Sequence, residues 1–529
     1  MKVTFCLIIF NLLDNIYAES FNVIGNQVFY GDTLVTFNGI GLTCTEYMLK
    51  PNMDSQSPYP GYWAYNSCFG GPTSAGGPIT LNSEVGNILK YLGSTYVRKP
   101  TINKVKFNGS FAQVINMSTP EHFPIVRIPM SGSCYLYDED TDTNDHTVYV
   151  DIIDAIVTNF TSNNVAVVLD LHWNCPDSTT LSGCQGAQSA SMALKNFGSK
   201  PGAVTFWSTI SKKYANNPLV FYELFNEPWI GLNQFTAYYA GSDKYAGMKE
   251  MYDAVRQNDP TGIVIIGGAE GYALDAQSLT AFWLQYKIDT GSYPTNVIYN
   301  IHPYQGAGQG LEHSPQSAMR FALALKSGPG PVIFTEFGQY CCGGSGNNEC
   351  TGGSGSCSNH ATGDNFVYNI INMGLQYDIS WIGWAWRGNN DDYPCGSKPD
   401  CQQPDMRSET GQLTSAEYGG ADWSTVWKAL VASNTLNVKD VTNGKTLTHT
   451  QDEAAGYLVR PCISGDYNLG GICGWDLSVP TSSLTPSDLT SQSIYDSILP
   501  GIPPNGNCKL EGCSSINYQC QTYTGPCKS

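Results

Sequence analysis

Two glutamates end two short apolar runs in the same way. Glu227 lies in LVFYELFNEPW (residues 219–229) and Glu336 lies in PVIFTEFGQ (residues 331–339). Continuous apolar runs of this length are typical of strands buried in a parallel sheet, so each carboxylate comes where a strand passes into a loop. One such glutamate alone would more simply cap a turn or pair with a cation. Two of them, presented alike, are what hydrolysis of a glycosidic bond requires, one as acid and base and one as nucleophile.

The two runs belong to a series of eight expected strands with helices between them. The expected strands are 34–41, 123–130, 165–171, the run from 219, 263–267, 296–301, 331–335 and 379–384. The expected helices are 83–92, 148–160, 204–214, 244–258, 278–286, 317–326 and 364–377. This alternation, with polar groups gathered after the strands, predicts an α/β fold, a closed (β/α)₈ TIM barrel with long cysteine-containing loops.

Further polar and aromatic residues accompany the other strands in a fixed order. They are Arg127 (VRIP, second strand), His172 (LDLHW, third), Asn226 and Pro228 around Glu227 (fourth), His302 and Tyr304 (sixth) and Trp384 (SWIGW, eighth). This set resembles glycoside hydrolase family 5 over roughly residues 34 to 432. The resemblance implies a retaining (β/α)₈ enzyme with Glu227 as acid/base and Glu336 as nucleophile, and neither a metal nor an organic cofactor.

The supporting residues have roles that the chemistry requires. Glu336 must stay ionised to attack the anomeric carbon, which a cation such as Arg127 within reach would favour. Tyr304 is expected to donate a hydrogen bond to the nucleophile. Asn226 is expected to bind the 2-hydroxyl of the sugar, where contacts strengthen in the transition state.

For the two histidines and the tryptophan, a purely structural role is the simpler alternative to a functional one. His172 and His302 are expected to tune and orient their neighbours, although a lone histidine is as readily a hydrogen-bonded core residue. Trp384 is expected to offer a flat face to a pyranose ring, although a lone buried tryptophan is more often part of the core. The presence of the other motif residues, each after its expected strand, favours the functional interpretation.

Composition limits the partners of the chain. Its 529 residues carry a formal net charge of −18 and show no basic cluster that could neutralise phosphates. Nucleic acids and anionic membranes are therefore poor partners. A neutral polysaccharide such as a cellulose-like β-glucan is compatible, and we expect a monomer.

The first 18 residues have the features of a secretory signal peptide. One lysine precedes an apolar stretch, and small Ala18 stands before Glu19, so we expect cleavage after Ala18 and an extracellular product. We find no later apolar run long enough to span a bilayer and no hydrophobic tail of the kind that precedes a lipid anchor. Glycosylation sequons begin at Asn108, Asn116 and Asn159, a pattern that fits secretion but is common by chance.

Cysteine usage also fits an oxidising compartment. Of 18 cysteines, Cys6 leaves with the signal peptide, and the odd number that remains leaves at least one unpaired or paired to another chain. The loop after the seventh strand holds Cys341, Cys342, Cys350 and Cys357. Such a cluster could bind zinc, but in a secreted chain disulfides are favoured. We expect them to shape the substrate cleft.

The strand and helix pattern fades beyond residue 432. We expect a signal peptide (1–18), a catalytic domain (19–432), an extension packed on the barrel (433–479), a Ser/Thr/Pro/Gly-rich linker (480–507) and a cysteine-rich tail (508–529). The tail is too short to build a core and would need two disulfides to hold a shape.

The sequence thus predicts a secreted retaining endo-β-1,4-glucanase, a cellulase that acts by double displacement. A β-mannanase or another β-glucanase is the alternative within the class, because discrimination between sugars rests on loop geometry. A non-catalytic polysaccharide-binding wall protein on an inactive barrel is the alternative from another class. It would be expected to have lost a carboxylate, and both carboxylates are present.

Overall fold

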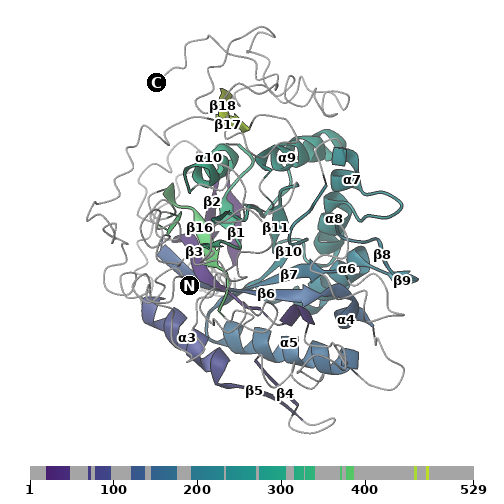
Figure 1. The fold of residues 1–529 in the computed structure, drawn as a ribbon, viewed down its shortest axis with the longest axis vertical. Helices are drawn as coiled ribbons and strands as arrows, with labels where there is room; N and C mark the ends of the chain where they lie inside the picture. The colour runs from purple at the N-terminus through teal and green to yellow at the C-terminus, as the bar shows by residue number, and fades with distance from the viewer. Residues whose placement is uncertain are drawn as a thin grey trace, which may run out of the picture.

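In the computed structural model, the described residues form a closed barrel of eight parallel strands (Figure 1). Their order around the barrel is β3 (Thr33–Gly41), β16 (Ser380–Gly383), β14 (Val332–Phe334), β12 (Val297–Asn300), β11 (Ile263–Gly267), β10 (Val220–Glu223), β7 (Ala166–Trp173) and β6 (Glu121–Ser131). β6 pairs again with β3 and closes the ring. The predicted TIM barrel is confirmed, and each expected strand forms.

The structure describes only part of the chain. The described residues are 20–31, 33–43, 45–47, 69–72, 78–96, 121–137, 145–174, 192–230, 234–269, 273, 275–305, 315–326, 328–339, 370–371, 374, 377–386, 458–461 and 472–475. Outside them lie the signal peptide, the sequons at Asn108 and Asn116, the four-cysteine loop, the linker and the tail. Asn159 is described, and it lies half-buried on α5 (Asp145–Ser162).

The barrel strands are buried because helices cover them outside and side chains fill them inside. Every residue of β10, β11 and β12 is buried. The amino-terminal half of the interior is filled by Phe37, Ile125, Val168, Phe221, Ile265, Ile298, Ile333 and Ile382. The strands therefore form a rigid frame, and the polar groups at their carboxyl ends project from fixed positions.

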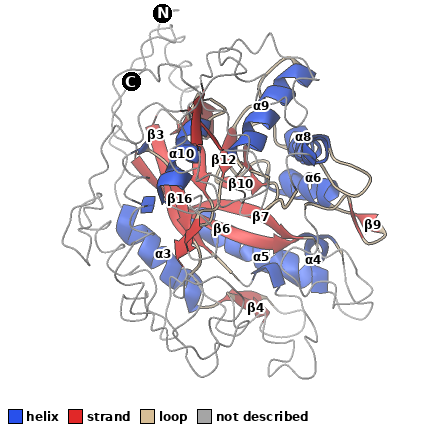
Figure 2. Ribbon diagram, turned by 45° about the horizontal axis from the view of Figure 1, so that its top comes forward, coloured by secondary structure: helices blue, strands red, loops and turns tan. Residues whose placement is uncertain are grey.

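Helices surround the strands in both views (Figures 1 and 2). The longer ones are α3 (Ser83–Tyr96), α5, α6 (Ala203–Tyr214), α8 (Met248–Asn258), α9 (Ala276–Thr290) and α10 (Pro315–Lys326). The short ones are η1 (Thr45–Tyr47), α4 (Gly132–Leu136) and α7 (Phe235–Ala240). Six predicted helices form, and most of the seventh, 364–377, lies outside the described residues. Within the described part of the chain, no helix is long and apolar enough to cross a membrane.

Two helix boundaries differ from those expected. The helix predicted over 244–258 begins only at residue 248, because residues 244–246 pair with residues 193–195: the Lys195 N–H donates to the Lys244 carbonyl and the Ala246 N–H to the Ala193 carbonyl. The helix predicted over 278–286 is longer at both ends. The Asp275 carboxylate caps its first turn by accepting two backbone N–H groups at 2.9 and 3.1 Å. Because of this cap, the helix begins at residue 276, two residues before the predicted start.

An antiparallel hairpin that was not predicted closes one end of the barrel. It consists of β1 (Phe21–Ile24) and β2 (Gln27–Tyr30), and β2 pairs with β3. The Phe21 ring lies 5.3 Å from Phe37 and 5.1 Å from Phe221, between ring centroids. These contacts cover the amino-terminal end of the barrel interior. The Gly-Asn pair between the two strands is a turn signal that the sequence did offer.

Four further strand pairs lie outside the barrel sheet. They are β4 (Gly70–Pro72) with β5 (Ile79–Leu81), β8 (Asn196–Phe197) with β9 (Lys200–Pro201), β13 (Tyr304–Gln305) with β15 (Gly338–Gln339), and β17 (Leu458–Pro461) with β18 (Ile472–Trp475). The pairing of β13 with β15 matters for the site, because it joins the loops that follow β12 and β14.

Candidate active site

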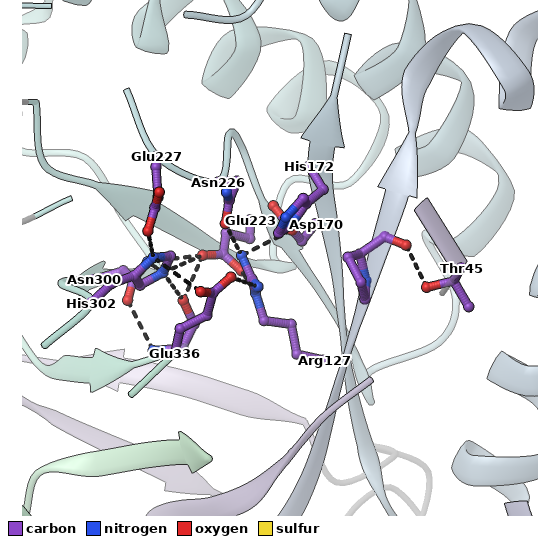
Figure 3. Close-up of polar contacts among 12 residues, drawn as sticks. Thr45, Arg127, Asp170, His172, Glu223, Asn226, Glu227, Asn300, His302 and Glu336 are labelled. Carbon is purple, nitrogen blue, oxygen red and sulfur yellow. Dashed lines mark hydrogen bonds and ion pairs between the residues drawn. The ribbon is translucent and has the colours of Figure 1, made fainter. Parts of the chain in front are cut away.

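The two glutamates meet at the carboxyl end of the barrel (Figure 3). Glu227 follows β10 and Glu336 follows β14. One oxygen of each carboxylate lies within 4.8 Å of the other. The Glu336 side chain is 6% exposed and that of Glu227 is 14% exposed, so both are largely buried and Glu227 is the more exposed of the two.

Arg127 links the nucleophile candidate to the barrel interior. From β6 its Nη1 donates to Glu336 Oε1, its Nε to Glu223 Oε2 at 2.5 Å, and its Nη2 to Asp170 Oδ2 at 2.9 Å and Asn226 Oδ1 at 2.8 Å. Burial opposes its charge, but the three carboxylates outweigh burial and raise the pKa of the guanidinium well above its usual value. Arg127 is thus a permanent cation that pairs with Asp170, Glu223 and Glu336 at the same time.

Glu336 receives a donor at each oxygen. Besides Arg127 at Oε1, the Tyr304 hydroxyl donates to Oε2 at 2.7 Å. Tyr304 begins β13, whose pairing with β15 holds the tyrosine beside the segment that carries Glu336. Two donors, one of them charged, stabilise a carboxylate and fix its orientation.

His302 lies between the two glutamates. Its Nδ1 is 2.9 Å from Glu227 Oε1 and 3.7 Å from Glu336 Oε2, and the side chain is fully buried. Burial disfavours an imidazolium, but the charge of Glu336 and the nearby carboxylates of Glu223 and Glu227 outweigh it and raise the pKa of His302 to about 9. The ring therefore supplies a positive charge and an N–H donor next to Glu227.

His172 and Trp384 form one wall of the site. Their rings stack with centroids 5.6 Å apart and planes at 7°. His172 Nδ1 is 2.7 Å from Asp170 Oδ2, and burial lowers its pKa to about 4, so this histidine is neutral. Trp384 is half-buried, and a Cβ on Gly41 would lie 2.9 Å from its indole ring. The glycine lets the indole lie flat against the end of β3.

All eight residues predicted for the site lie within this connected group. Sequence analysis missed four further members, namely Asp170, Glu223, Asn300 and Thr335, all of which are fully buried. The first two stand as single charges inside apolar strands, VVLDL and VFYEL. A buried charge needs a partner, so each was a signal that a cation lay nearby.

One more acid lies close by. Glu46 in η1 follows β3 and is buried, with Oε2 lacking a hydrogen bond. Burial, together with the charges of Asp170 and Glu336, raises its pKa well above the usual value. Its environment therefore favours the neutral carboxylic acid over the carboxylate.

The described residues contain one group close enough to hold a metal ion, formed by Glu227, His302 and Glu336. Their donor atoms are already used. His302 Nδ1 is bonded to Glu227, and both oxygens of Glu336 accept hydrogen bonds. These hydrogen bonds occupy most of the atoms that would bind a metal ion.

A (β/α)₈ barrel with two carboxylates facing each other at the strand ends defines a glycoside hydrolase. The family model described as cellulase (glycosyl hydrolase family 5) matches residues 99–390, more than half of the chain. The chain belongs to this family, and the resemblance seen in the sequence is confirmed.

Individual relatives are more distant. A stretch of 128 residues is 27% identical to Endoglucanase Z of Dickeya dadantii (strain 3937); it covers 23% of this chain and spans only 25% of that relative. The catalytic domain of Thermobifida fusca endoglucanase Cel5A (E5) is 14% identical with a TM-score of 0.42, over 78% of this chain and 97% of the other. The β-glucanase SdGluc5_26A of Saccharophagus degradans is also 14% identical, with a TM-score of 0.41 over 79% and 96%.

Proposed function

We propose that the protein is a secreted, monomeric, retaining endo-β-1,4-glucanase that hydrolyses a cellulose-like β-glucan. The observation that carries the retaining mechanism is the short gap between Glu227 and Glu336, with one oxygen of each within 4.8 Å. Retaining glycosidases hold their carboxyl groups about 5–5.5 Å apart, whereas inverting enzymes need about 6.5–9.5 Å to admit a water. The gap supports direct attack by a carboxylate.

The surroundings of the two carboxylates support their division of roles. Glu336, which accepts hydrogen bonds from Arg127 and Tyr304, attacks the anomeric carbon and forms a covalent glycosyl–enzyme bond as the glycosidic C–O bond breaks. Glu227 gives its proton to the departing oxygen. It then takes a proton from the water that releases the sugar. Its greater exposure and its contact with His302 suit a group that exchanges protons in every turnover.

Three observations support the substrate and the location. The family is described as cellulase, and the curated relative is named an endoglucanase. The net charge of −18 disfavours polyanionic polysaccharides. Residues 1–18 have the sequence features of a signal peptide.

Digestion of a polysaccharide panel tests the proposal. We expect reducing ends to be released fastest from a soluble β-1,4-glucan, with viscosity falling early because cuts fall within the chain. Proton NMR of the same digests should show the β-anomer first. Faster release from mannan would move the enzyme to the mannanases. An α-anomer formed first would refute retention.

Replacing Glu227 by glutamine should affect substrates according to their leaving groups. A natural sugar leaving group needs the proton, so we expect a loss of about 10²- to 10⁴-fold in kcat/KM on the polysaccharide. An aryl glycoside with an acidic phenol needs no such help, and its first step should be nearly unchanged. Rates on a series of aryl glycosides measure the difference. Equal losses on every substrate would show that Glu227 is not the acid.

A further inference from the structure

His302 rests on a buried polar group formed by Glu223, Asn300 and Thr335. Its Nε2 lies 2.9 Å from Asn300 Nδ2, 2.9 Å from Thr335 Oγ1 and 3.7 Å from Glu223 Oε1. Glu223 Oε1 in turn lies 2.8 Å from Asn300 Nδ2 and 2.6 Å from Thr335 Oγ1. The four side chains are fully buried. Their hydrogen atoms can therefore be assigned by counting donors and acceptors.

Glu223 acts only as an acceptor. It is bonded to Arg127 at 2.5 Å; burial would raise its pKa, but the charges of Arg127 and His302 outweigh burial and lower it to about 2. The single hydroxyl hydrogen of Thr335 must therefore point at Glu223, which leaves only a lone pair of Oγ1 for His302. Asn300 is oriented by its Oδ1, which accepts the Thr335 backbone N–H at 2.9 Å.

The Nε2 atom of His302 consequently faces one acceptor and one donor. When Nε2 carries a proton, it donates to the Thr335 oxygen. When Nε2 is bare, it accepts the second amide hydrogen of Asn300, whose first hydrogen goes to Glu223. Either state is hydrogen-bonded without any movement of the ring, which a buried imidazole seldom achieves because one state normally lacks its partner.

We propose that Thr335, Asn300 and Glu223 are positioning residues that let His302 gain or lose a proton at Nε2 in place, and that they thereby control the charge that His302 presents to the acid Glu227. The second half of the proposal rests on the proposed function, because it takes Glu227 as the acid. Thr335 stabilises the imidazolium, and Asn300 stabilises the neutral ring. Glu223 orients both.

The charge of His302 acts directly on Glu227, because the two side chains are in contact. An imidazolium whose Nδ1 lies 2.9 Å from Glu227 donates a hydrogen bond to this carboxylate and places a positive charge beside it. The other ionisable groups that face His302 are Glu336 at 3.7 Å, Glu223 at 3.7 Å and, further off, Asp170. All three are anions when ionised, and they favour the imidazolium.

Two substitutions should shift the pH at which His302 loses its proton in opposite directions. Thr335→Val removes the acceptor, so His302 should lose its proton about one pH unit lower than in the wild type. Asn300→Ala removes the donor to the bare ring, so His302 should keep its proton to higher pH than in the wild type. Thr335→Ser keeps the hydroxyl, so His302 should lose its proton at the same pH as in the wild type.

Nitrogen NMR of the imidazole gives a readout that does not depend on turnover. The chain has seven histidines, and His302 can be assigned by comparison with His302→Gln. Opposite displacements of the His302 titration in the two variants, with Thr335→Ser unchanged, support the network even if the wild type cleaves no polysaccharide; inactivity would count against the proposed function alone. Unchanged titrations, or displacements of one sign, in variants that retain cooperative thermal unfolding would overturn it.

Discussion

Replacing Glu336 by glutamine is expected to lower turnover of every substrate by at least about 10⁴-fold. The amide has nearly the shape of the carboxylate, but it has no charge with which to attack the anomeric carbon. Unlike Glu227→Gln, the loss should not depend on the leaving group, because formation of the glycosyl–enzyme needs the nucleophile whatever departs. Initial rates on a β-glucan and on an activated aryl glycoside measure the effect.

A matched control separates chemistry from folding. Glu250 lies on the outer helix α8, where it accepts the backbone N–H of Gly247 and pairs with Lys195 at 3.1 Å. Glu250→Gln changes one carboxylate far from the site and should keep wild-type rates. If Glu336→Gln unfolds at the wild-type temperature yet keeps more than a few per cent of the activity, another group is the nucleophile.

The sequence predicts the barrel well because its signals are local. Each strand is a short apolar run that a helix follows, and a parallel barrel brings all carboxyl ends to one face. Residues as distant as Arg127 and Trp384 could therefore be placed in one site before any contact was known. The hairpin β1–β2 escaped notice because its strands have only four residues each and lie next to an expected signal peptide.

The buried polar contacts beneath the site could not be predicted in the same way. Glu223 bonds to Arg127 across 96 positions of sequence, to Asn300 across 77 and to Thr335 across 112. A charge inside an apolar strand indicates that some partner exists, but the choice depends on strand order and register around the barrel. The proton assignment of His302 depends on distances of a few tenths of an ångström, which no residue pattern contains.

Arg127→Met is expected to lower the free energy of unfolding at pH 7 by about 3–5 kcal/mol, the usual effect of removing one partner from a buried ion pair. The variant leaves Asp170, Glu223 and Glu336 together without their cation. Arg127→Lys keeps the charge but lacks the planar set of donors that reaches all three, so it should recover only part of the loss. Chemical denaturation followed by tryptophan fluorescence measures both.

The loss of unfolding free energy in Arg127→Met should depend on pH in one direction. In the wild type the pKa of Glu223 is lowered from 4.5 to about 2, so its ionisation contributes stability that is present above about pH 4.5 and is lost as pH falls towards 2. In Arg127→Met the crowded carboxylates gain by protonation instead. The difference between the two proteins should therefore be greatest at neutral pH and should shrink between pH 5 and pH 3.

Arg256→Met is the control for this pH dependence. Arg256 on α8 also makes many hydrogen bonds, but those to Asp259, Gly262 and Thr295 go to backbone carbonyl oxygens, which do not titrate. Its loss of stability should therefore change much less between pH 7 and pH 3. If Arg127→Met shows the same flat response, the three carboxylates do not depend on Arg127 for their charge.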